Sequence, residues 1–77
     1  MTPAQSRAAR ALLDWTQPTL AEAAQLGLST VVDFEKNRRI VSNEAITAIR
    51  QALEAAGIIF IPSNGNGPGV RLRDRQP

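Results

Sequence analysis

Two short clusters of basic residues carry the most distinctive chemistry in this chain. The first consists of Lys36, Arg38 and Arg39, and the second of Arg71, Arg73 and Arg75. Ammonium and guanidinium groups gathered in this way suit contacts with phosphate groups. For the first cluster we favour phosphate binding over mere solvation of a loop, because it directly follows a candidate helix. For the second cluster we favour solvation of a tail.

Residue types that would support catalysis or metal binding are missing or scattered. The chain contains no cysteine and no histidine, so the usual zinc ligands and the commonest general base are absent. Its seven carboxylates form no recognisable acid/base or metal motif. The glycine-rich segment 63–69 lacks the Gly-Lys-Ser/Thr ending of a phosphate-binding loop. We therefore expect no enzyme activity, no metal and no cofactor.

The segments around the first basic cluster are predicted to be helical. Thr2, Thr16 and Ser42 stand where helix N-caps are expected, and Pro3 and Pro18 suit first turns. Apolar residues recur at helical spacing within each segment. These signals predict helices over about 3–13, 17–25, 28–36 and 43–56, with a loop over 37–41.

The end of the chain has a different character. The β-branched and aromatic run 58–61 predicts a strand, residues 62–69 are rich in turn formers, and 70–73 alternates apolar and basic residues. These features predict a β-hairpin over about 58–73, followed by a disordered tail over 74–77. Since an isolated hairpin is marginal in water, it must pack on the helices or pair with another copy of the chain.

The stretch from Gln17 to Glu35 is patterned like two short helices that meet at a turn. Leu20, Ala21 and Ala24 form one apolar stripe, and Val31 and Phe34 begin another. Gly27 stands where the chain is expected to bend and restart. This arrangement is the helix-turn-helix plan, in which the second helix enters a DNA major groove.

At these positions the chain resembles the phage-repressor/Cro-like (XRE) helix-turn-helix family. The resemblance covers about residues 5–57, and the ending 58–73 is similar to a tail of small bacterial members. The matching positions are Gln17, Leu20, Ala21, Leu26, Ser29, Thr30, Val31, Phe34 and Glu35. The resemblance implies a mostly α fold over residues 1–77: a single four-to-five-helix, lambda-repressor-like domain, helical over about 3–57, with a C-terminal β-hairpin.

The resemblance also implies a set of DNA-binding residues. The reading face of the second helix of the motif would present base-edge contacts, and flanking residues would contact the DNA backbone. The implied set is Gln17, Leu28, Ser29, Thr30, Asp33, Lys36, Asn37, Arg38 and Arg39. Family members commonly carry Gln, Arg, Lys, Ser or Asn on the reading face, so Leu28, Val32 and Asp33 depart from the pattern. Leu28 suits a thymine methyl, and Asp33 suits a cytosine amino group.

A structural ion pair between Arg10 and Glu35 is implied as well. In the family, an arginine on the first helix often pairs with a glutamate at the end of the third, and both positions are occupied here. Such a pair would fix two helices relative to each other. The alternative is two independent surface charges. Trp15, at a helix junction, is predicted to plug the core.

The predicted function is sequence-specific binding of double-stranded DNA by a small cytoplasmic transcriptional regulator acting as a repressor. One reading helix makes few contacts, so a homodimer paired through the C-terminal strands is expected. No apolar run approaches the length of a membrane span. The alternative function is a protein-interaction module on the same fold, such as an antitoxin-like partner.

Overall fold

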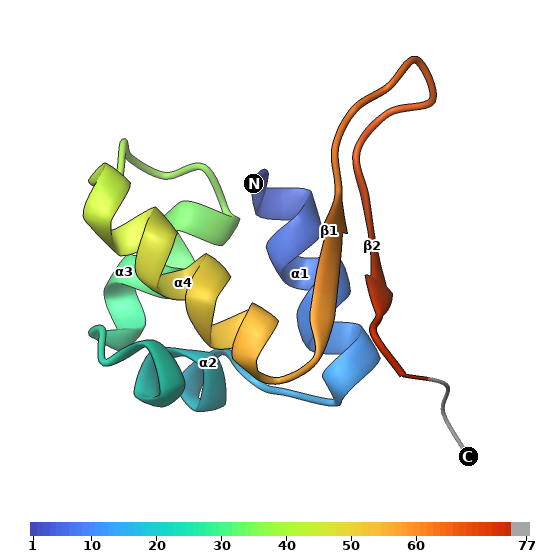
Figure 1. The fold of residues 1–77 in the computed structure, drawn as a ribbon. Helices are drawn as coiled ribbons and strands as arrows, with labels where there is room; N and C mark the ends of the chain where they lie inside the picture. The colour runs from blue at the N-terminus through green and yellow to red at the C-terminus, as the bar shows by residue number, and fades with distance from the viewer. Residues whose placement is uncertain (75–77) are drawn as a thin grey trace.

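Four α-helices and one β-hairpin form the structure, a computed structural model that describes residues 1–74 (Figure 1). In chain order the elements are α1 (Pro3–Leu13), α2 (Gln17–Ala24), α3 (Leu28–Glu35), α4 (Asn43–Ala55), β1 (Ile58–Ile61) and β2 (Gly69–Leu72). The mostly α class and the hairpin were predicted correctly, with boundaries within about one residue. The tail predicted over 74–77 lies, beyond Asp74, outside the described residues.

The starts of the helices follow the capping signals in the sequence. The Thr2 hydroxyl accepts a hydrogen bond from the Gln5 backbone N–H, and the Gln5 side chain accepts one in return from the Thr2 N–H. Thr16 and Ser42 cap α2 and α4 through their side-chain oxygens. The N-cap of α3 is Gly27, which has no side chain to accept a hydrogen bond. The three predicted N-caps are therefore confirmed.

The ends of the first three helices use left-handed residues that are not glycine. Asp14, Gln25 and Asn37 have φ angles of 56°, 58° and 54°. Gly27 was expected where the chain bends and restarts, and it lies there as the N-cap of α3, with an extended backbone (φ −66°, ψ 148°). The left-handed residue of this connection is Gln25, two residues earlier. Each left-handed residue forms part of a Schellman motif that satisfies the last carbonyls of its helix.

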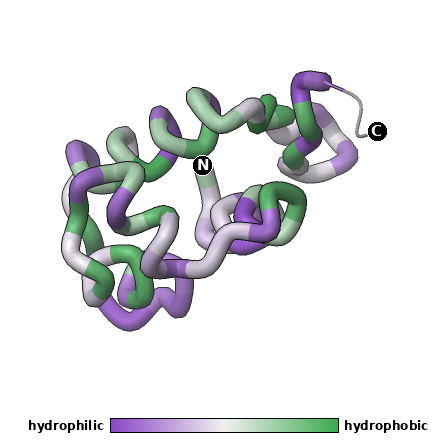
Figure 2. Tube along the Cα trace, turned by 90° about the horizontal axis from the view of Figure 1, so that it is seen from below, coloured by the Kyte–Doolittle hydropathy of each residue, from purple (hydrophilic) through white to green (hydrophobic). Residues whose placement is uncertain are grey.

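The core lies where the apolar stripes of the helices meet. Figure 2 shows hydrophobic and hydrophilic residues interspersed along the trace. Within a helix this mixture places the apolar residues on one face, which packs against the core. Trp15 packs against the edge of the core while staying partly exposed. The buried apolar residues are Ala9, Leu20, Ala21, Val31, Phe34, Val41, Ala45, Ile49, Leu53 and Ile58.

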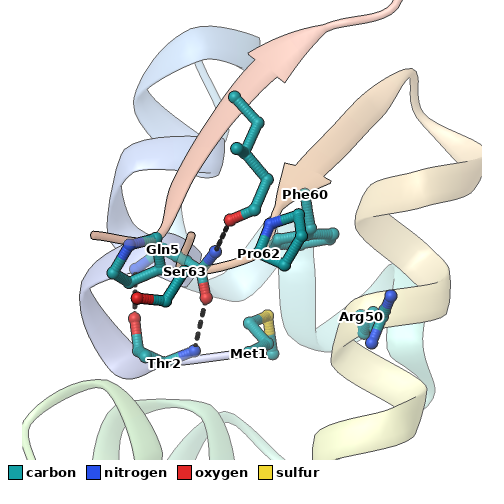
Figure 3. A pocket seen from close by; sticks show the side chains of 9 residues that line it. Met1, Thr2, Gln5, Arg50, Phe60, Pro62 and Ser63 are labelled. Carbon is teal, nitrogen blue, oxygen red and sulfur yellow. Dashed lines mark hydrogen bonds between the residues drawn. The ribbon is translucent and has the colours of Figure 1, made fainter. Parts of the chain in front are cut away.

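The hairpin packs on the helices of its own chain. Its antiparallel register pairs Ile58 with Leu72, and β1 lies against α4 while β2 lies against α1 (Figure 1). The buried Gln5 side chain of α1 ties the two ends of the chain together. Its Nε2 donates to the Gly69 carbonyl at 2.9 Å and to the Ile61 carbonyl at 3.4 Å. Figure 3 shows Gln5 between the start of α1 and the hairpin. No helix in the described part of the chain is long and apolar enough to cross a membrane.

Candidate functional site

The predicted ion pair between α1 and α3 forms at the end of α3. Glu35, its last residue, is only 1% exposed, and its Oε1 lies 2.8 Å from Nη2 of Arg10. The Arg10 Nε donates to both carboxylate oxygens at 3.1 and 3.0 Å. A planar guanidinium that grips a carboxylate in this way fixes the angle between two helices.

Three further side chains complete the hydrogen bonding of Glu35. The Ser6 hydroxyl donates to Oε2 at 2.5 Å, and Nε2 of Gln17 donates to Oε1 at 3.0 Å. Arg7 donates to the backbone carbonyl of Glu35. Among the described residues, no buried side-chain nitrogen or oxygen lacks a partner. One carboxylate therefore joins α1, α2 and α3.

This environment keeps Glu35 ionised. Burial disfavours the charged carboxylate, but hydrogen bonds from Arg10, Ser6 and Gln17, together with the positive charge of Arg10, outweigh that effect. The pKa of Glu35 therefore lies below its ordinary value.

The opposite side of α3 forms an outward stripe. Leu28 is 46% exposed and Ser29 is exposed, while Thr30, Val32 and Asp33 are half-buried. Ser29 and Asp33 are four residues apart, so they lie one above the other on the same helix face. The structure thus brings the predicted reading-face residues together on one surface of α3.

The basic cluster is placed by the turn that ends α3. The N–H of the left-handed Asn37 bonds to the Phe34 carbonyl at 3.2 Å, and the N–H of Arg38 bonds to the Asp33 carbonyl at 2.9 Å. This pair of bonds is the Schellman motif. Lys36 and Arg38 are exposed and form no ion pair with the described residues. The turn therefore fixes the backbone that carries these cations, next to the outward stripe.

One predicted DNA contact is joined to another by an ion pair that was not predicted. The Arg39 Nε lies 2.9 Å from Oδ2 of Asp33, and the side chains are 51% and 22% exposed. The chain doubles back at Asn37, which returns Arg39 to the outward stripe. Asp33 and Arg39 are therefore one charged unit and not two separate contacts.

The residue after Arg39 was also not singled out from the sequence. Ile40 is 97% exposed, whereas its neighbour Val41 is buried in the core. A large aliphatic side chain in that position has no packing role in the described residues. It stands beside the basic cluster, on the loop between α3 and α4.

Some members of the site left a weak signal in the sequence and others left none. Arg7 was not singled out from the sequence, although its spacing of three residues from Arg10 places both on one face of α1. Ser6 is a small polar residue with no distinguishing pattern. The Asp33–Arg39 pair depends on the left-handed turn at Asn37. Asparagine adopts that conformation more readily than most residues, so the turn left a weak signal in the sequence, whereas the pair itself left none.

A separate pocket lies between the start of α1, α4 and the hairpin (Figure 3). Its volume is about 360 Å³, and Arg50, over the Phe60 ring at 5.6 Å, is its one charged side chain. Its lining residues are Met1, Thr2, Gln5, Arg50, Phe60, Ile61, Pro62, Ser63 and Pro68. The pocket is thus mainly apolar, and it is not formed by the outward stripe of α3.

No protein-family model matches the chain, and no curated protein matches it. Function must therefore be inferred from the residues and their geometry.

Proposed function

We propose that this protein is a sequence-specific DNA-binding transcriptional regulator of the helix-turn-helix type. In this proposal α2 and α3 are the two helices of the motif, and α3 enters the major groove. Its reading residues are Leu28, Ser29, Thr30 and Asp33. We expect it to repress the gene to which it binds.

One observation carries the proposal: the outward stripe of α3 borders a basic cluster on a fixed turn. The inner face of α3 is committed to the core through Val31 and Phe34, so only the stripe is available to a partner. A helix that offers short polar side chains beside uncompensated cations fits a groove lined by phosphates. Lys36, Asn37 and Arg38 would contact the DNA backbone there.

Gln17 can contribute to backbone binding at the start of α2. One N–H of its side-chain amide is bonded to Glu35. An amide nitrogen carries two hydrogens, so a second donor remains for a phosphate oxygen. The bond to Glu35 fixes the amide orientation, which reduces the entropy lost when a phosphate binds.

The first test is selection of bound DNA from a random pool with the purified chain. We expect one enriched sequence, and binding that weakens steeply as salt rises, because phosphate contacts release counterions. Recovery of no sequence above background, with no salt dependence, would contradict the proposal.

A matched pair of variants locates the interface. Replacing Lys36 and Arg38 with alanine removes two positive charges beside α3, and replacing Arg50 and Arg73, which are exposed on α4 and after β2, removes two elsewhere. We expect the first variant to shallow the slope of log K against log salt by about one to two units, and the second to change it little. Equal effects would show that net charge matters and position does not.

We further propose that the active form is a homodimer paired through β2. The N–H of Arg73 bonds to the Gly57 carbonyl at 2.7 Å, so backbone groups alternate along β2 and those of Val70 and Leu72 point away from β1. A second β2 could pair there in antiparallel register. In the symmetric register that pairs Val70 of each copy with Leu72 of the other, Arg71 lies opposite Arg71 of the second copy.

That register makes an unusual prediction for association. Salt screens the repulsion between the two Arg71 side chains, so dimerisation should strengthen with salt while DNA binding weakens. Replacing Arg71 with serine should strengthen the dimer, and replacing Val70 with proline, which removes an outward N–H, should abolish it. Sedimentation of the unaltered chain as a monomer at micromolar concentration in low and high salt would contradict the dimer.

The exposed side chain of Ile40 favours a second candidate function, a protein-interaction module. An apolar contact beside a basic loop suits a protein partner, such as the toxin of an antitoxin-like pair. Such an interface would respond weakly to salt. If the protein is an interaction module, replacing Ile40 with serine should weaken the protein complex. If it binds DNA as proposed above, the same change should leave binding to the selected DNA unchanged.

A further inference from the structure

We propose that Asp33 is a positioning residue that holds Arg39 for bidentate recognition of one guanine. The inference rests on the DNA-binding function proposed above, and it assigns Arg39 a different role from Lys36 and Arg38. In the sequence prediction Arg39 was one more phosphate contact. The ion pair with Asp33 changes its placement, because it brings the guanidinium over the outward stripe of α3.

The geometry of the pair leaves the recognising atoms of Arg39 available. Asp33 accepts from Nε at 2.9 Å, and neither Nη1 nor Nη2 bonds to any described residue. The Arg39 side chain is 51% exposed and the Asp33 side chain only 22%. The Asp33 carboxylate is therefore the less exposed partner, and it holds Arg39 through Nε while Nη1 and Nη2 remain free to donate.

The support itself is rigid. Asp33 lies within α3, and its backbone carbonyl accepts the N–H of Arg38 at 2.9 Å. The left-handed Asn37 fixes the direction in which the chain returns. Backbone hydrogen bonds thus set Asp33 and the residue that precedes Arg39 before any ligand arrives, which lowers the entropic cost of holding the arginine in place.

The chemistry of the projecting groups selects the ligand. Two parallel N–H donors match the O6 and N7 acceptors of guanine in the major groove. Phosphate oxygens accept the same fork. We commit to guanine because the outward stripe is the surface proposed to face base edges, and Asp33 lies on that stripe. A carboxylate next to the DNA backbone would instead be repelled by the phosphates.

The test uses a duplex with the sequence selected by the unaltered protein. In one series each guanine is replaced by 7-deazaguanine, which lacks the N7 acceptor, and in another single phosphates are replaced by uncharged methylphosphonates. We expect one 7-deazaguanine to weaken binding by about 5- to 150-fold in the unaltered protein. The Arg39→Ala variant should be indifferent to that substitution.

Asp33 is tested by its effect on that discrimination. Asp33→Ala should bind unrelated DNA more tightly, because a negative charge is gone, yet lose most of the discrimination at the same guanine. Arg39→Lys, which keeps the charge but not the fork, should lose it as well. The double variant Asp33→Ala/Arg39→Ala should discriminate no less than either single variant, since the two residues act as a unit.

Three results would overturn the inference. Unchanged guanine discrimination in Asp33→Ala would make Asp33 a source of repulsion only, and DNA binding would still stand. If the contribution of Arg39 to DNA affinity were lost with one methylphosphonate and with no 7-deazaguanine, the Arg39 guanidinium would be assigned to a phosphate. Failure of the unaltered protein to bind any DNA would reject both this inference and the proposed function. Thermal unfolding of each variant separates these results from loss of fold.

Discussion

Two arginine–carboxylate pairs share helix α3 but differ in what surrounds them. Glu35 is buried and joined to Arg10, Ser6 and Gln17, while Asp33, two residues earlier, holds Arg39 at the surface. Residues two apart on a helix point to different faces. The same ionic chemistry therefore serves the core on one face and leaves charged groups available on the other.

Burial decides the difference between the pairs. A buried charge must be hydrogen-bonded, and the Glu35 carboxylate accepts from Arg10, Ser6 and Gln17, which fixes its place in the core. An exposed pair contributes little to stability, and its atoms remain able to exchange partners. Two pairs that are neighbours in the sequence can thus differ in role, and their exposure is what distinguishes them.

The largest expected effect is on the buried pair. Replacing Glu35 with alanine leaves Arg10 partly buried without its partner, and we expect a loss of about 3–5 kcal/mol in the free energy of unfolding. Denaturant titration would measure it. Replacing both Arg10 and Glu35 with apolar residues should restore much of that stability. A loss of unfolding free energy no larger than that of Asp33→Ala would contradict the difference between the buried and the exposed pair.

The next effect isolates one donor to Glu35. Replacing the fully buried Ser6 with alanine removes a hydrogen bond to a charged group, and we expect a loss of about 1.5–3 kcal/mol. Ser29→Ala, on the exposed stripe of the same protein, is the matched control and should leave the unfolding free energy nearly unchanged. Equal effects of the two changes would argue against a special role for the network.

The buried pair should also respond to acid. The pKa of Glu35 is lowered in the folded state, so its contribution to stability is present above the unfolded pKa, near the ordinary value of 4.5, and is lost as pH falls through the folded pKa. The difference in stability between the unaltered protein and Glu35→Ala should therefore shrink below pH 4.5. Chemical unfolding at a series of pH values would show it. A difference independent of pH would contradict the assignment of charge to Glu35.

The smallest effect is expected at the surface pair. Replacing Asp33 with alanine should change the free energy of unfolding by no more than about 0.5 kcal/mol, because the pair is exposed and screened by salt. The measurement is the same denaturant titration, repeated in high salt. A loss as large as that of Glu35→Ala would mean that the surface pair is structural, which would weaken its proposed part in recognition.

What the sequence could predict follows from how local each interaction is. The caps of Thr2, Thr16 and Ser42 act within three residues, so the starts of three helices could be read directly. The left-handed conformation of Gln25 could not be, because glutamine has no preference for it and only the packing of α2 against α3 imposes it.

The same distinction explains the candidate site. The Arg10–Glu35 pair was anticipated because a resemblance supplied a contact between residues that lie far apart in the sequence. The bond from Arg39 to Asp33 had no such support, since it needs the chain to reverse at Asn37. Exposure of Ile40 beside the buried Val41 is likewise set by the path of the loop and not by residue type.

The hydrogen bonds from Gln5 to the hairpin have a consequence for the order in which the molecule can assemble. Gln5 belongs to the first helix to be synthesised, but its acceptors, the carbonyls of Ile61 and Gly69, are made 56 and 64 residues later. Until the hairpin has been made, the Gln5 amide must therefore remain hydrogen-bonded to water. The helix α1 is synthesised before the hairpin against which it packs, so its docking cannot be complete until β2 has been made.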